Sequence, residues 1–168
     1  DVNTTFGSLG LAAEFAQSDP NDALSVAAQE NNTAWNAKLN YNIGNLAIGA
    51  GFTTVETNYA APGYWSRIGR AVNLTNVTGP MANVSYALGS RITLTAEGSF
   101  LEPDQDLVAV EGRTAIDQGR VVSQAGLDKI TAWKAGLKYG LTSTNSVDLG
   151  WEEVTWNPTA AGADTTER

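Results

Sequence analysis

The feature that most constrains the fold is an alternation of apolar and polar residues with a period of two. In the clearest segment the apolar positions are Trp35, Ala37, Leu39, Tyr41 and Ile43, and the residues between them are mostly polar. Gly44 and Asn45 follow, and the alternation then resumes at Leu46, Ile48, Ala50 and Phe52. Such a pattern predicts two β-strands joined by a two-residue hairpin turn. Pairing Ile43 with Leu46 keeps all the apolar residues on one side, which a slip of one residue would destroy.

The same pattern recurs along the chain and predicts about seven antiparallel strands. They cover residues 5–17, 33–43, 46–55, 81–88, 92–101, 130–139 and 147–156. If Tyr139 pairs with Val147, Lys138 lies opposite Asp148 and Lys134 lies opposite Glu152, which gives two favourable cross-strand charge pairs. Residues 130–137 also fit a helical period, so a helix remains an alternative there. Segment 19–30, which opens with Asp19 and Pro20 and continues Ala-rich, suggests a short helix within a loop.

The connections between these strands alternate in length. Short turns fall near residues 44, 90 and 143, and long loops cover residues 18–32, 56–80 and 102–129. Transmembrane β-barrels have short turns on one side of the membrane and longer loops on the other. We therefore expect an all-β fold of antiparallel up-and-down transmembrane strands that belongs to a larger outer-membrane β-barrel.

Charge separates the two faces of the predicted strands. A lysine or arginine that faces lipid at the bilayer midplane costs about 2–4 kcal/mol, so a bilayer favours a face without charge. The face expected to contact lipid carries Trp35, Leu39, Tyr41, Phe52, Tyr86, Leu94, Trp133, Leu137 and Trp151. The opposite face, expected to line a lumen, carries Glu14, Asn36, Lys38, Asn40, Arg91, Glu97, Lys134, Lys138 and Asp148. On the lipid face the pattern predicts no charge before Glu153, at a strand end.

A soluble β-sandwich is the alternative, because its inner face would also be apolar. It would be secreted and would bind carbohydrate, through Trp65 or Trp156, or another envelope protein. However, the predicted strands approach the 9–11 residues that span a tilted bilayer, whereas strands of globular proteins commonly have about 5–6. Seven strands are too few for a bacterial barrel, and an open sheet would leave backbone groups unpaired in lipid. The membrane interpretation therefore requires the remainder of a parent barrel as a partner.

Composition excludes several classes of function. The chain has no histidine and no cysteine, so no enzyme that uses either residue as a base or nucleophile is possible. A net charge of −8 argues against nucleic-acid binding. The acidic residues Glu102, Asp104, Asp106 and Glu111 fit a solvated loop better than a Ca²⁺ site, since the EF-hand register is missing. We expect neither enzymatic activity nor a cofactor, and the sequence leaves a bound metal open.

Segment 61–80 carries the most distinctive loop motif. The run Pro62-Gly63-Tyr64-Trp65, followed by Ile68-Gly69 and set between two alternating strands, resembles loops of the S-layer-like outer-membrane proteins of the Deinococcus–Thermus group. The resemblance implies a large β-barrel in the outer membrane of a protein that also has a wall-binding domain and a coiled coil, neither of which is present here.

The expected function follows from the pattern and the resemblance together. The pattern predicts a porin-like barrel segment that passes ions and small solutes by diffusion. The resemblance implies a place in the bacterial outer membrane at the cell surface, a contribution to cell-envelope integrity, and a homo-oligomer in a surface layer (S-layer).

Overall fold

The structure is a computed structural model that describes most of the chain. The described residues are 1–18, 32–57, 59, 67–68, 71–72, 75–104, 114–117, 120–123, 127–158 and 164–167. Within these ranges no helix is long and apolar enough to cross a membrane. The segment 19–30, for which the sequence suggests a helix, lies outside the described residues.

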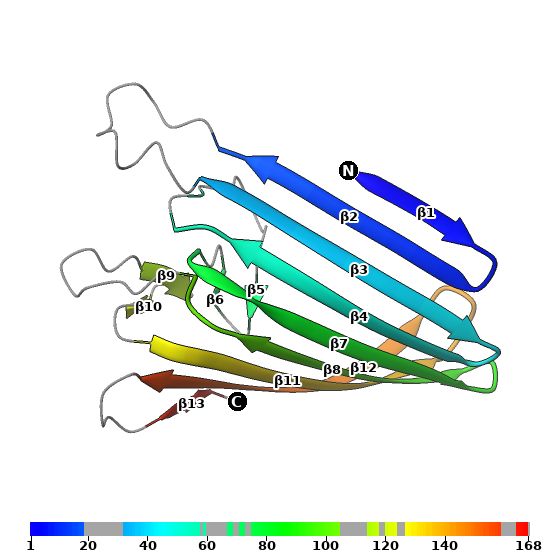
Figure 1. Cartoon of the computed structure of the whole chain (residues 1–168). Helices are drawn as coiled ribbons and strands as arrows, with labels where there is room; N and C mark the ends of the chain where they lie inside the picture. Colours follow the sequence, from blue (N-terminus) through cyan, green and yellow to red (C-terminus); the bar gives the residue numbers. More distant parts are fainter. Residues whose placement is uncertain are drawn as a thin grey trace.

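The described part of the chain is dominated by one antiparallel sheet of nine strands, and the all-β, up-and-down expectation is confirmed. In spatial order its strands are β1 (Val2–Phe6), β2 (Leu9–Gln17), β3 (Thr33–Ile43), β4 (Leu46–Val55), β7 (Val77–Leu88), β8 (Ile92–Leu101), β11 (Leu127–Gly140), β12 (Ser146–Pro158) and β13 (Thr165–Glu167). The hairpin turns gather at one end of this sheet, the turn end, and the longer connections lie at the other, the long-connection end (Figure 1). The sheet is open, since β1 and β13 are its two edges.

The register of the strands follows the apolar alternation as predicted. In the β3–β4 hairpin Ile43 pairs with Leu46 and Tyr41 with Ile48. In the β11–β12 hairpin Tyr139 pairs with Val147, and residues 130–139, for which a helix was the alternative, lie within strand β11. Register is fixed this strongly because a shift of one residue would move every side chain to the other face.

The prediction of a single strand over residues 5–17 is wrong. The chain turns at Gly7 and Ser8, so that β1 and β2 form a hairpin in which Phe6 pairs with Leu9. Gly7 has a φ of 62°, which a glycine adopts without the steric cost of a Cβ atom. Gly44 and Gly89 begin the next two hairpin turns with similar positive angles. This hairpin raises the number of strands from the expected seven to eight, and β13, which the sequence does not predict, is the ninth strand of the main sheet.

Two of the predicted long loops contain strands. Four short strands form a second sheet in the order β10-β9-β6-β5: β5 (Arg67–Ile68), β6 (Ala71–Val72), β9 (Thr114–Asp117) and β10 (Arg120–Ser123). Their backbone pairing joins the connection between β4 and β7 to the connection between β8 and β11. Strand β7 also begins at Val77 rather than at residue 81. The predicted bounds of the long loops 56–80 and 102–129 are therefore wrong, because each range contains two short strands and the start of a long one, at Val77 for β7 and Leu127 for β11.

The hydrophobic core lies on the polar face of the main sheet, at the long-connection end. It consists of Ala34, Val55, Tyr59, Val77, Leu101, Ile130, Ala132, Val154 and Trp156, all nearly inaccessible to solvent. In the same strands, the residues nearer the turn end on this face are polar, charged or small, apart from Met81. The polar face therefore differs along each strand. At the long-connection end its side chains are mostly apolar and pack into a core, as in a globular domain.

The apolar face of the main sheet is exposed. Every large hydrophobic residue that is exposed in the described part of the chain projects from this face, apart from Leu141, which lies in a turn. Folded monomers rarely expose contiguous apolar patches larger than a few hundred Å², and larger ones mark interaction surfaces. Since this patch crosses eight strands, it is a surface that a partner or a lipid phase would have to cover.

Candidate functional site

The polar face of the main sheet is the candidate site, and the predicted lumen-facing residues gather there. Glu14, Asn36, Lys38, Asn40, Glu97, Lys134, Lys138 and Asp148 lie on strands β2, β3, β8, β11 and β12, at positions that alternate with the apolar face. Arg91 is the exception, because it lies in the turn between β7 and β8 and not on a strand face. The reason is that the turn takes three residues and β8 begins only at Ile92.

A single row of cross-strand pairs organises the centre of this face. We call it the central polar row; in order across six strands it consists of Asn40, Gly49, Asn83, Glu97, Lys134 and Glu152. Gly49 lies between the two asparagines, and a Cβ atom there would meet the side-chain oxygens of both Asn40 and Asn83. The glycine therefore makes room for two amide side chains on neighbouring strands.

Lys134 lies between two carboxylates of the central polar row. Its Nζ atom is 3.4 Å from Oε1 of Glu97 and 3.3 Å from Oε1 of Glu152. Further toward the turn end, Nζ of Lys138 is 4.0 Å from Oδ1 of Asp148. Both charge pairs predicted across the β11–β12 hairpin are confirmed. The charges thus compensate one another across neighbouring strands of the polar face.

Replacing Lys134 with methionine removes the positive charge between two carboxylates. We expect the free energy of unfolding in detergent micelles to fall by about 0.5–1 kcal/mol, since partly exposed ion pairs contribute little more. Urea titration measures this change. Lys138→Met is the matched control and should have a smaller effect, because its pair with Asp148 is longer and more exposed. Equal losses for the two variants would contradict the ranking.

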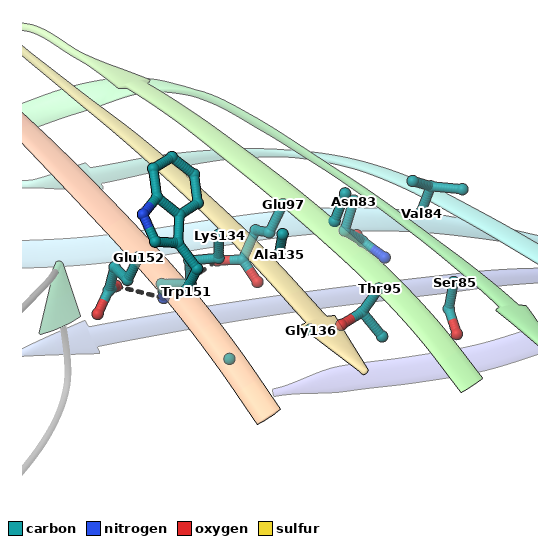
Figure 2. Close-up of a pocket in the computed structure, with 12 residues that line it drawn as sticks. Asn83, Val84, Ser85, Thr95, Glu97, Lys134, Ala135, Gly136, Trp151 and Glu152 are labelled. Carbon is teal, nitrogen blue, oxygen red and sulfur yellow. Dashed lines mark hydrogen bonds and ion pairs between the residues drawn. The ribbon is translucent and has the colours of Figure 1, made fainter. Parts of the chain in front are cut away.

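A depression lies over the part of the central polar row that runs from Asn83 to Glu152. It has a volume of about 500 Å³, and the residues that line it from the polar face are Asn83, Ser85, Thr95, Glu97, Lys134, Gly136, Gly150 and Glu152. Figure 2 shows the ion pair between Lys134 and Glu152, with Trp151 and Val84 on the other side of their strands from Thr95 and Ser85. A Cβ atom at Gly136 would meet Oγ1 of Thr95 at 2.5 Å, so the glycine leaves the floor of the depression open. The arrangement suits water, ions and small polar solutes.

Asn83, Ser85, Thr95 and the glycines of this depression are absent from the sequence-predicted site. Their period-two spacing with Val84 and Ala96 was a signal that could have found them, since it places them opposite apolar neighbours. The predicted lumen-facing set consists of charged residues and the two asparagines Asn36 and Asn40, and it does not include the smaller polar residues of β7 and β8.

The long-connection end carries a separate polar cluster. Oε2 of Glu56 accepts hydrogen bonds from the backbone N–H and the Oγ1–H of Thr33, both at 2.7 Å. The backbone N–H of Asp104 donates to the carbonyl oxygen of Asn76. Burial and the nearby charge of Glu56 raise the pKa of the Asp104 carboxyl group above its usual value. The folded chain therefore holds the Asp104 proton more tightly than the unfolded chain does.

Asp104→Asn is expected to stabilise the fold at neutral pH. Because the pKa of Asp104 is raised on folding, the ionised carboxylate opposes folding once the pH exceeds this pKa, and the amide removes that cost. The gain should be small, and it should disappear near pH 3, where the carboxyl group of the parent chain is protonated. Thermal unfolding at both pH values measures it. A variant less stable than the parent at pH 7 would show that the charged carboxylate makes a necessary contact.

The residues predicted to face lipid all lie on the apolar face, and all are exposed. The set is Trp35, Leu39, Tyr41, Phe52, Tyr86, Leu94, Trp133, Leu137 and Trp151. Their aromatic rings interact across strands: the rings of Trp35 and Phe52 stack with centroids 5.6 Å apart, and those of Phe100 and Trp133 meet edge to face at 5.0 Å. Gly98 lies beneath the Trp133 ring, which occupies the space where a Cβ atom would stand. That this face meets lipid stays a prediction.

The structure bears on two alternatives from the sequence, a carbohydrate-binding tryptophan and a metal site formed by acidic residues. Trp156, considered as a platform for carbohydrate, is buried in the core and is not available for stacking. Trp65, the other such residue, and the acidic residues Asp106 and Glu111 lie outside the described residues. Within the described part of the chain, no group of three or more acidic side chains could hold a metal ion.

Of the motif that carries the family resemblance, only Arg67 and Ile68 lie in described secondary structure, as strand β5. Comparisons of the chain with protein-family models, with curated proteins and with solved structures gave no match.

Proposed function

We propose that this chain forms part of the wall of a porin-like outer-membrane β-barrel. Its apolar face contacts the acyl chains of the membrane, and its polar face lines a water-filled lumen through which ions and small solutes diffuse. Selectivity in such a pore arises from the side chains that line it. Here these include the mixed charges of the central polar row.

The separation of charge between the two faces carries this proposal. Within the strands of the main sheet, the apolar face bears two charged residues, Lys129 and Glu153, toward the long-connection ends of β11 and β12. Lys129 was not expected there, because the sequence places the start of that strand at residue 130. Apart from Asp128, which lies at the register shift between Leu127 and Lys129, all other charges between the two ends of these strands project from the polar face. A bilayer imposes such a distribution, since a charge at its midplane is costly.

The open edges of the sheet support the part of the proposal that requires a larger barrel. In the described residues β13 pairs with only Val154–Trp156 of β12, and β1 pairs with β2 alone. Unpaired backbone N–H and C=O groups cost several kcal/mol each in hydrocarbon. The wall must therefore continue through further strands on both sides. A place in a surface layer, with other copies of the chain, is proposed from the family resemblance only.

Reconstitution into vesicles tests the proposal. The full chain is refolded into phosphatidylcholine vesicles whose lipids carry bromine along the acyl chains, and its tryptophan fluorescence is compared with that in unbrominated vesicles. We expect strong quenching, because Trp35, Trp133 and Trp151 are exposed on the apolar face. A chain that is soluble and folded without detergent and shows no quenching would contradict the proposal and favour a β-sandwich. Ion conductance across planar bilayers tests the pore and is measured on the whole barrel that contains this chain. A barrel that inserts without conducting would contradict the pore but not the membrane wall.

A further inference from the structure

Aromatic side chains form two belts on the apolar face of the main sheet. The belt nearer the long-connection end, the tryptophan belt, consists of Phe15, Trp35, Phe52, Phe100, Trp133 and Trp151. The belt nearer the turn end, the tyrosine belt, consists of Tyr41, Tyr86 and Tyr139. Between the belts the face is aliphatic. Tryptophan and tyrosine prefer the interface between the hydrocarbon and the headgroups of a membrane. The direction in which each belt crosses the strands therefore indicates how the strands are oriented relative to the bilayer plane.

The tyrosine belt does not follow the rows of cross-strand pairs. Tyr41 pairs with Ile48, which pairs with Val84, and Tyr86 lies two residues beyond Val84 toward the turn end. The same step is repeated further on. Tyr86 pairs with Leu94, which pairs with Leu137, and Tyr139 lies two residues beyond Leu137. The belt therefore advances toward the turn end by one residue for each strand crossed.

The tryptophan belt has the same slope. The row through Trp133 passes Gly98, Ala82 and Ala50 and reaches β3 at Leu39. Leu39 lies four residues from Trp35, and four strand-to-strand steps separate β3 from β11. The slope is again one residue per strand in the same direction. As a result, Trp35 and Tyr41 are as far apart along β3 as Trp133 and Tyr139 are along β11.

The charges of the apolar face agree with this slope. Glu153 pairs with Trp133 and so lies on the same row as Leu39, in the middle of the aliphatic part of β3. Along the sloped belt, however, the boundary on β12 lies at Trp151, and Glu153 falls outside it. Lys129 precedes Trp133 on β11 and also falls outside. The sloped boundary thus encloses a face without charge, whereas a boundary along the row of pairs through Trp35 would enclose Glu153.

We infer that the membrane interfaces run along the two aromatic belts, so that the strands cross the bilayer at a tilt. A slope of one residue per strand, with a rise of about 3.4 Å per residue and a strand spacing of about 4.8 Å, corresponds to a tilt of about 35°. Transmembrane barrels have strand tilts of roughly 35–45°. The inference rests on the proposed function and assigns the tryptophan belt and the tyrosine belt to opposite lipid headgroup regions.

Site-directed spin labelling tests the tilt. The chain contains no cysteine, so each single-cysteine variant takes one nitroxide label with no other change. The full chain carries the label at Trp35→Cys, Leu39→Cys or Trp133→Cys and is refolded into phosphatidylcholine vesicles. Collision with oxygen and with a water-soluble nickel chelate, measured by electron paramagnetic resonance, gives the depth of each label. We expect residues 35 and 133 at equal depth and residue 39 deeper by about 6 Å, because residue 39 lies two residues from Tyr41 and the tyrosine belt is its nearer interface.

Leu39 and Trp133 make the test decisive, because they share one row of cross-strand pairs. Equal depths for these two, with residue 35 at a different depth, would mean untilted strands and would overturn the inference while leaving the membrane barrel intact. Labels accessible only to the nickel chelate at all three positions would overturn the proposed function, and this inference with it.

A second set at the turn end guards against a variant that does not fold. It compares Tyr41→Cys, Tyr139→Cys and Ala135→Cys, of which Ala135 lies on the row of Tyr41 through Ile48, Val84 and Ala96. Residues 41 and 139 should lie at equal depth, and residue 135 should lie deeper. If the labels at residues 41 and 135 lie at the same depth instead, the inference is overturned, whatever the tryptophan variants show.

Discussion

Replacing Leu39 with lysine is expected to lower the stability of the bilayer-inserted chain by about 2–4 kcal/mol. Leu39 is exposed on the apolar face, and it lies between Trp35 of the tryptophan belt and Tyr41 of the tyrosine belt on the same strand. On the proposed arrangement, an ammonium group there would lie near the hydrocarbon midplane. Urea-dependent unfolding from phosphatidylcholine vesicles, followed by tryptophan fluorescence, measures the loss.

The adjacent residue provides the matched control. Asn40 lies on the same strand but projects from the polar face, where it is exposed. Asn40→Lys introduces the same side chain at nearly the same depth, and we expect a change of no more than about 0.5 kcal/mol, as for ordinary surface substitutions. Equal losses for Leu39→Lys and Asn40→Lys would contradict the assignment of the two faces. A tolerated lysine at residue 39 would exclude lipid contact there.

Gly79→Ala is expected to destabilise the sheet by about 3 kcal/mol, because overpacking against backbone is not relieved by a change of rotamer. Gly79 is buried on strand β7, and a Cβ atom at this position would collide with the carbonyl oxygen of Phe100 and lie 3.0 Å from Cα of Leu101. Both obstacles are main-chain atoms of the neighbouring strand β8. Its φ of 155° is also one that side chains of L residues rarely adopt. Denaturant unfolding in detergent micelles measures the loss.

Gly10→Ala is the control for this substitution. Gly10 lies on the polar face of β2, and the nearest atom to a Cβ there would be Cγ2 of Thr5 at an ordinary van der Waals distance of 3.8 Å. We expect Gly10→Ala to be neutral or slightly stabilising, since alanine loses less backbone entropy on folding than glycine does. A comparable loss for both variants would show that strand glycines matter for a reason other than the close approach of β7 and β8.

The long strands and their registers could be predicted from the sequence because they depend on neighbours along the chain. The pairing of Tyr139 with Val147 follows from period-two alternation on both sides of a turn, and with it the ion pairs of Lys134 and Lys138. The same alternation placed the lipid-facing candidates on one exposed face. Each of these features is a local pattern that a shift of one residue would destroy.

The features that sequence reasoning missed depend on contacts between distant segments or on weak turn signals. The strands β6 and β9 pair although Val72 and its partner Ile116 are 44 residues apart along the chain, and no local pattern predicts such a pairing. The turn at Gly7 and Ser8 carries a weak signal, because the apolar positions change there only from even numbers (Val2, Phe6) to odd ones (Leu9, Leu11). The core at the long-connection end was not predicted either, since Val55, Leu101 and Trp156 fall on the face that is polar elsewhere.

The spacing of the two aromatic belts has a consequence for the host membrane. Six residues separate Trp35 from Tyr41 and also Trp133 from Tyr139, which is about 20 Å along a strand and about 17 Å along the normal of a bilayer crossed at the inferred tilt. The hydrocarbon core of a typical bilayer is about 30 Å thick. The lipid around this wall would therefore have to compress, at a cost of a fraction of a kcal/mol for each Å of hydrophobic mismatch. Such a wall would partition into thin membranes and insert most readily into short-chain lipids.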